Sequence, residues 1–256
     1  MLVTNTFERR FKRMLPRKIK QCLRDIFASQ IFGWCIKKFR IRKNVLGGTF
    51  DYSLVSNKEA GRIFWGIWEA AEIRFAKNYA NSATIIELGS SVGVTLGVLS
   101  SQTMKPTRYV CVEANPRNYE KLRHLTKLLP TRHTYSLYNR AIDYSGEATV
   151  SFEILSTAGS RVATVDSRGP VSDVPAITLS SLLEKERIKN YTLITDIEGA
   201  EAHIFSKDAD ALKECRTIIV ELENTRSFSK RDQINLLTQV GFNIAESYGD
   251  VYVFTK

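Results

Sequence analysis

The sequence predicts an α/β fold in which a mostly parallel sheet carries helices on both faces, preceded by a basic helical extension. Three observations lead to this prediction. Apolar strand patterns alternate with helical patterns from residue 83 onward, which is typical of a doubly wound sheet. Two of the strands end in acidic residues followed by small-residue turns. Residues 1–43 contain 13 Lys/Arg and only 2 acidic residues, whereas the rest of the chain is almost neutral.

The N-terminal extension is predicted to span residues 1–47 and to form one or two helices, with a break or restart at Pro16. Its apolar residues recur every four positions between Phe7 and Phe27, and basic residues occupy the other faces. Three interpretations remain open. The extension could lie on an anionic membrane surface, pack on the body or on a second subunit, or form a disordered or nucleic-acid-binding arm.

Gly47-Gly48 marks the expected boundary to a second domain over residues 48–256. A helical pattern covers residues 56–79, and residues 156–175 read as a long loop that could form a substrate wall. Strands are predicted near residues 83–88, 108–113, 134–141, 147–154, 191–196, 216–222 and 250–255. Helices are predicted near residues 92–101, 116–129, 178–187, 199–206 and 230–240.

The chain shows no secretory signal and no uncharged run of the roughly 20 residues that a membrane span requires. Its 4 cysteines are far apart and form no Cys-x-x-Cys pair, which favours reduced thiols. We therefore expect a cytoplasmic protein, with peripheral attachment at the inner membrane face as an option that the basic extension raises.

The first predicted strand ends in a turn that is typical of a nucleotide-like ligand. Glu87 is followed by Gly89 and Gly93, whereas Ser91 stands where a dinucleotide-binding turn has the middle glycine that lets the backbone approach a pyrophosphate. S-Adenosylmethionine, which has no pyrophosphate, fits this spacing better. Glu113 follows the second strand, 24 residues after Gly89, where a carboxylate can accept hydrogen bonds from both ribose hydroxyls.

A second acidic motif follows the strand near residues 191–196. Asp196 and Glu198 precede a predicted helix that begins at Gly199. Parallel sheets bind ligands at the carboxyl ends of their strands, so both acids are expected to border the same ligand as Gly89 and Glu113. The alternative is that Glu198 and Glu201 only complement the positive end of the helix.

These motifs together resemble the FkbM family of S-adenosylmethionine-dependent methyltransferases. The resemblance covers roughly residues 48–256. It rests on Ile85 to Gly93, Val112 to Leu122, Ile177 to Leu183, Asp196 to Glu201, Ile218 to Glu221 and Leu236 to Phe242. It implies a Rossmann-like class I methyltransferase fold with a seven-stranded sheet, and O-methylation that often targets sugar hydroxyls.

The sequence departs from the family pattern at three places. Ala114 stands where a proline is frequent, Ser90-Ser91 replace Ala-Asn, and Thr195 replaces part of a Lys-Ile pair. The last departure leaves the charge of Asp196 less compensated, which leaves the substrate or ion preference open.

A sugar hydroxyl is a poor nucleophile, so a base or a metal ion should assist. Asp196, Glu198, Glu221 and His203 are the catalytic candidates. A carboxylate cluster could hold Mg²⁺ through oxygen ligands, although the chain shows no His/Cys metal-binding spacing. The residues expected to bind the cofactor are Glu87, Gly89, Ser91, Gly93, Glu113, Asn115, Ala141 and Ile142.

The leading hypothesis is an O-methyltransferase that acts on a sugar hydroxyl of a glycan or glycolipid in polysaccharide biosynthesis. One alternative is a non-catalytic glycan-binding or assembly protein on a methyltransferase fold. Another is a nucleic-acid methyltransferase, which the neutral body makes a weaker hypothesis. The oligomeric state is not predicted.

Overall fold

The computed structural model describes residues 29–154, 161–162, 171–197 and 199–256. These form two compact units, one made of residues 29–46 and 51–68 and the other of residues 47–50 and 69–256. The apolar pattern predicted between Phe7 and Phe27 lies outside the described residues. Among those that are described, no helix is long and apolar enough to cross a membrane.

The first unit is built on two short helices, α3 (Gln30–Lys38) and α4 (Asn57–Phe64), with a 3-10 turn η1 (Tyr52–Leu54) between them. Each helix begins at a capping serine: the Ser29 hydroxyl accepts from the backbone N–H of Phe32, and Ser56 forms a reciprocal capping box with Glu59. The helices approach closely because α3 presents Gly33, where a Cβ atom would lie 1.8 Å from the carbonyl oxygen of Asn57.

The helical pattern predicted over residues 56–79 is interrupted in the structure, so that part of the prediction is wrong. Helix α4 ends at Phe64, and α5 (Ala70–Tyr79) begins in the second unit. Gly66 and Glu69, in the intervening turn, have φ angles of 63° and 47°. A left-handed backbone does not propagate an α-helix, so the helix is interrupted here.

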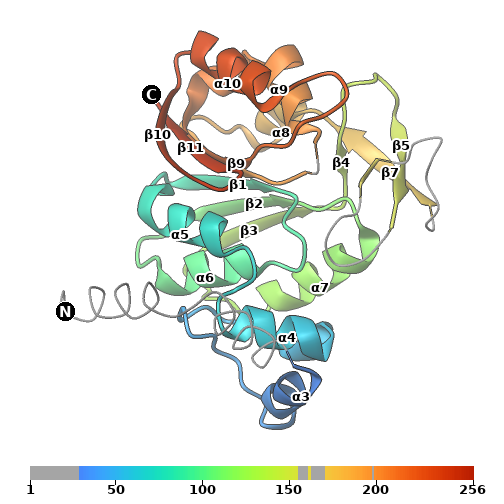
Figure 1. Ribbon diagram of the computed structural model, residues 1–256, viewed down its shortest axis with the longest axis vertical. Coiled ribbons are helices and arrows are strands. Elements are labelled where there is room, and N and C mark those ends of the chain that lie inside the picture. Colours follow the sequence, from blue (N-terminus) through green and yellow to red (C-terminus); the bar gives the residue numbers. More distant parts are fainter. Residues whose placement is uncertain (1–28, 155–160, 163–170, 198) are drawn as a thin grey trace. The chain divides into compact units, whose positions relative to one another are not determined.

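The second unit contains a seven-stranded sheet of order β10-β11-β9-β8-β1-β2-β3 (Figure 1). Five neighbouring strands are parallel, and β11 and β10 are antiparallel at one edge. The strands are β1 (Thr84–Leu88), β2 (Arg108–Val112), β3 (Thr134–Tyr138), β8 (Tyr191–Thr195), β9 (Cys215–Glu221), β10 (Asn243–Tyr248) and β11 (Val251–Thr255). The predicted fold class, a seven-stranded and mostly parallel sheet, is confirmed.

Helices cover both faces of this sheet (Figure 1). One face carries α5, α6 (Val94–Gln102) and α7 (Pro116–Thr126), and the other carries α8 (Leu179–Glu186), α9 (Glu201–Lys207) and α10 (Lys230–Gln239). A short 3-10 turn, η2 (Ala211–Glu214), precedes β9. The core on the α8–α10 face joins strand residues such as Ile86 and Val220 to helix residues such as Leu182, Phe205 and Leu237.

A second, smaller sheet has the order β4-β7-β5-β6. Its strands are β4 (Ala141–Ile142), β5 (Thr149–Glu153), β6 (Arg161–Val162) and β7 (Val171–Ile177). The strand predicted over 134–141 is therefore divided between the two sheets, and the one predicted over 147–154 belongs to the small sheet. The loop predicted over 156–175 is wrong at β6 and from Val171 onward, where β7 begins.

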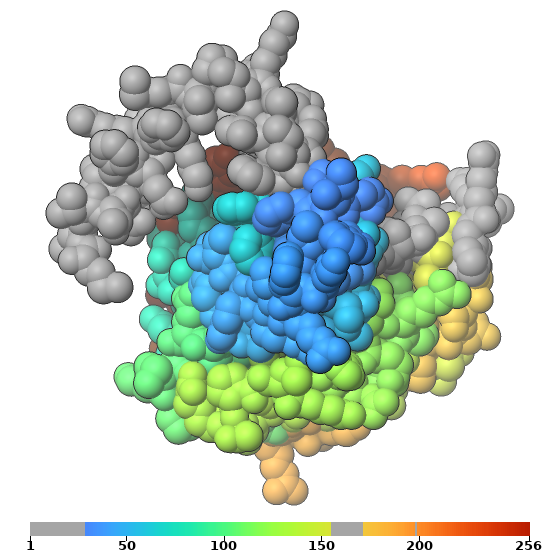
Figure 2. Space-filling model, turned by 90° about the horizontal axis from the view of Figure 1, so that it is seen from below, coloured from blue at the N-terminus to red at the C-terminus, as the bar shows by residue number. Residues whose placement is uncertain are grey.

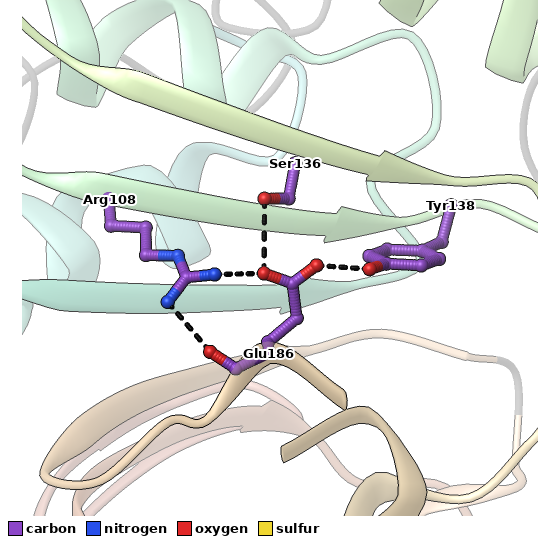
Figure 3. Close-up of polar contacts among 4 residues, drawn as sticks. All are labelled: Arg108, Ser136, Tyr138 and Glu186. Carbon is purple, nitrogen blue, oxygen red and sulfur yellow. Dashed lines mark hydrogen bonds and ion pairs between the residues drawn. The ribbon is translucent and has the colours of Figure 1, made fainter. Parts of the chain in front are cut away.

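Glu186, at the end of α8, ties that helix to the edge of the main sheet (Figure 3). Its carboxylate accepts from the guanidinium of Arg108, from the hydroxyl of Tyr138 and, at 3.3 Å, from the hydroxyl of Ser136. Burial and the adjacent carboxylate raise the pKa of Tyr138 to about 12, so its hydroxyl stays a donor. The cluster fixes β3 at Tyr138, whose carbonyl accepts the backbone N–H of Glu113 at 3.0 Å.

Candidate functional site

The candidate site is the edge of the main sheet where the parallel strands end. Because β1, β2, β8 and β9 are parallel, their carboxyl ends lie along one edge. The acidic residues Glu87, Glu113, Asp196 and Glu221 all belong to these strand ends. The edge predicted to bind a ligand is therefore strongly acidic.

The turn after β1 contacts both neighbouring strand ends through its backbone. The N–H groups of Gly89 and Ser90 both donate to the carbonyl of Val112, at 2.9 and 3.1 Å. Gly89 has a φ of 82°, and a Cβ atom at this position would lie 1.9 Å from the carbonyl oxygen of Asp196. Only glycine allows both the left-handed conformation and this close approach of the β1 and β8 turns.

The same turn begins helix α6 at Gly93, which also has a φ of 82°. A Cβ atom there would lie 2.7 Å from Leu122 and 2.8 Å from Leu125, both in α7. Gly93 therefore serves helix packing. Ser91 has a φ of 47°, which is uncommon outside glycine, and this conformation aims its N–H at Glu113.

Glu113 is held in place by two backbone hydrogen bonds. Its two carboxylate oxygens accept one backbone N–H each, from Ser91 and from Asn115, both at 2.7 Å. Asn115 also caps α7 by accepting from the N–H of Arg117. Burial raises the pKa of Glu113 to about 7, against the lowering effect of these two hydrogen bonds. Glu113 therefore holds the β1 turn and the β2–α7 turn together.

Glu87 lies nearby and is buried, and its carboxylate accepts from the Cys111 thiol at 3.8 Å. Burial, followed by repulsion from the Glu69 carboxylate, raises the pKa of Glu87 well above its usual range. Within the part of the chain that the structure describes, neither Glu87 nor Glu113 forms a salt bridge. A buried carboxylate without a cationic partner is costly in its ionised form, so it tends to hold a proton unless a cationic ligand compensates its charge.

Glu69 is a member of the site that the sequence analysis missed. It lies at the left-handed turn before α5, and its carboxylate accepts from the Thr95 hydroxyl in the first turn of α6 at 2.9 Å. Repulsion from Glu69 raises the pKa of both Glu87 and Glu113. The only sequence signal was Gly66, three residues earlier, which could have indicated a break in the 56–79 helix.

The turn after β8 places Asp196 next to the β1 turn. The N–H of Asp196 donates to the carbonyl of Leu88 at 3.1 Å, and its side chain is partly exposed. The Glu201 carboxylate braces this turn by accepting from the N–H groups of Ile197 and Gly199, at 2.6 and 2.9 Å. Burial raises the pKa of Glu201 to about 7. Glu198, a catalytic candidate, lies outside the described residues.

The remaining candidates are spread more widely. Glu221 ends β9, one strand beyond Asp196, and is partly exposed. His203 is exposed on α9, and its ring packs edge-on against Phe228 at a centroid distance of 6.0 Å. Ala141 and Ile142 form β4 with their side chains in apolar clusters, so only their backbone could reach a cofactor.

The structure gives no support to the Mg²⁺ option. Among the described residues, which leave out Glu198, no group of three or more His, Cys, Asp or Glu side chains is arranged to hold a metal ion.

Comparison with curated proteins gives no match. Among solved structures, the chain resembles a magnesium protoporphyrin IX methyltransferase from Synechocystis PCC 6803 with bound S-adenosylmethionine. The two chains are 12% identical, with a TM-score of 0.44, and the match covers 92% of this chain and 94% of that one. The chain also resembles an O-methyltransferase from Bacillus cereus in complex with S-adenosylhomocysteine, at 14% identity and a TM-score of 0.40, covering 73% and 79% of the two chains. These similarities are too low to assign an activity.

The comparison with protein families is more specific. The description "Methyltransferase FkbM domain" matches residues 89–252, which include the β1 turn from Gly89, Glu113 and the Asp196 turn. The match spans well over half of the chain and contains most of the candidate site. The chain therefore belongs to the FkbM family of methyltransferases, as its motifs predicted.

Proposed function

We propose that this protein is an S-adenosylmethionine-dependent O-methyltransferase that methylates a sugar hydroxyl of a glycan or glycolipid. Family membership supports methyl transfer. The observation that carries the proposal is the bridge from Glu113 to Ser91 and Asn115, which prepares a ribose-binding carboxylate beside the glycine turn. The sugar acceptor rests on the motif resemblance alone.

The hydrogen-bond acceptors at this edge of the sheet fit the cofactor. A carboxylate has about four lone-pair sites, and the two N–H donors occupy two of those on Glu113, which leaves two for the ribose hydroxyls. The Glu69 carboxylate places further negative charge near Glu113. This charge suits a ligand with a sulfonium and an ammonium group. When bound, S-adenosylmethionine supplies an electrophilic methyl group on a positively charged sulfur.

Asp196 is the proposed catalytic residue. Its backbone is fixed on both sides, by the hydrogen bond to Leu88 and by the contact of its carbonyl with Gly89, and its side chain remains partly exposed at the acidic edge. A carboxylate in this position can accept the proton of an acceptor hydroxyl and orient its oxygen. Glu198 and Glu221 are the next candidates. His203 packs against Phe228 instead.

The proposal is tested by offering the full chain and methyl-labelled S-adenosylmethionine to three acceptors in parallel: a glycolipid extract, free oligosaccharides and RNA. We expect label in the carbohydrate, recovered as an O-methyl sugar by mass spectrometry after acid hydrolysis. Asp196→Asn serves as the matched control. Label in RNA, or no transfer to any carbohydrate by a protein that binds the cofactor, would contradict the acceptor assignment.

A further inference from the structure

The first unit exposes four large apolar side chains on α3 and in the segment after it, here called the α3 surface. Ile31 is 76% exposed, Trp34 50%, Phe39 73% and Val45 50%. We propose that the α3 surface docks on an anionic membrane. In Figure 2 the blue atoms belong to the segment that carries this surface.

Helical geometry explains why these side chains face outward. Ile31, Trp34 and Lys38 follow one another at intervals of three and four residues, so they share one face of α3. The opposite face contains Gly33 and Ile36, both buried, and Gly33 is in backbone contact with α4. Packing within the unit therefore uses one face of the helix and leaves an apolar face uncovered.

The segment that carries the α3 surface is basic. Residues 29–50 contain five Lys/Arg and no acidic residue. Arg42 pairs with Asp51 at 2.6 Å, and the ammonium of Lys37 donates to the carbonyl of Val55 at 2.5 Å. The Lys38 ammonium lies 4.5 Å from the centre of the Trp34 ring, and Arg40 is exposed one residue beyond Phe39.

This combination matches an anionic lipid surface better than a nucleic acid. Phosphates of RNA attract cations but gain little from exposed Ile31 or Phe39 side chains, whereas the boundary between headgroups and acyl chains accommodates both. A tryptophan with a neighbouring cation suits this boundary, since its ring is apolar and its N–H reaches the polar region. Each Lys or Arg near an anionic leaflet strengthens the attraction to it.

The test is co-sedimentation of the full chain with vesicles of phosphatidylcholine alone or mixed with phosphatidylglycerol. We expect binding to the anionic vesicles only. The triple variant Ile31→Ser, Trp34→Ser, Phe39→Ser should lower the partition coefficient by at least about tenfold, because it removes the apolar contribution at three sites that are at least half exposed. The control Met104→Ser, Tyr248→Ser, which changes two exposed side chains of the other unit, should bind as the wild type does.

A spectroscopic measurement removes any dependence on correct folding of the triple variant. Brominated lipids in the anionic vesicles should quench the tryptophan fluorescence of the wild type. Trp34→Phe should remove most of that quenching, because Trp68 is buried and Trp65 is only partly exposed and packs against Phe32 and Phe64. A triple variant that sediments like the wild type, quenching that is undiminished in Trp34→Phe, or tight binding to duplex RNA without vesicle binding would overturn the proposal.

Discussion

Affinity for S-adenosylmethionine should rise with pH around neutrality because of Glu113. Burial raises the pKa of this carboxyl from 4.5 to about 7. In the protonated form, one oxygen becomes a donor, so the group can no longer accept from Ser91, Asn115 and two ribose hydroxyls together. Binding therefore requires the ionised form, which becomes abundant as pH rises through the pKa of the free protein.

The size of the effect follows from this pKa. About a tenth of Glu113 is ionised at about pH 6 and about nine tenths at about pH 8, so the association constant should increase roughly tenfold across this range. Glu113→Gln has no ionisable group and one acceptor oxygen fewer. Its affinity should be at least about tenfold weaker at the upper pH and almost independent of pH.

Isothermal titration calorimetry at constant ionic strength measures both quantities. The control is Glu120→Gln, which removes an exposed carboxylate of α7 that pairs with Arg123 and should leave the pH dependence unchanged. A wild-type affinity that does not change with pH, or a tenfold change that survives in Glu113→Gln, would refute the assignment of this titration to Glu113.

Three further substitutions probe the turns at the sheet edge. Gly89→Ala should lower the free energy of unfolding by at least about 2 kcal/mol in urea denaturation, because a Cβ atom would lie 1.9 Å from the Asp196 carbonyl and φ is 82°; an unchanged midpoint would count against this contact. Thr195→Val should raise the free energy of unfolding by about 1 kcal/mol, because the buried Thr195 hydroxyl has no hydrogen-bond partner among the described residues. A less stable variant would show that this hydroxyl has a partner. Asp196→Asn should bind the cofactor within about twofold of the wild type and lose about a hundredfold or more in kcat, and retained turnover would exclude Asp196 as the base.

Much of the second unit could be predicted because its parallel strands are buried on both faces and read as continuous apolar runs. Strands β1, β2, β8, β9 and β11 were located to within a residue or two. Strand β10 was missed, since its residues Asn243–Tyr248 are mostly exposed and show no apolar alternation. The strand predicted over 147–154 is instead β5 of the small sheet, because a local pattern carries no information on which sheet a strand joins.

In the candidate site, too, residues with a local sequence signal were predicted, and residues whose role depends on distant contacts were missed. Glu87, Gly89 and Glu113 were found because strand-terminal acids and glycine turns are local signals. Glu69 was missed because its role depends on one left-handed residue that separates α4 from α5 and brings a carboxylate next to Thr95. The bracing of the Asp196 turn by Glu201 was also not foreseen, since the sequence offered only a favourable interaction with the helix end.

The most direct test of the central claim is a competition between ligand classes for the folded wild type. Titration with S-adenosylmethionine, S-adenosylhomocysteine and NAD should show one molecule of either methionine-derived ligand bound per chain and no binding of NAD, because Ser91 replaces the glycine that a pyrophosphate requires. No binding of S-adenosylmethionine, or a preference for NAD, would contradict the account of the β1 turn and of Glu113 as a methyl-donor site.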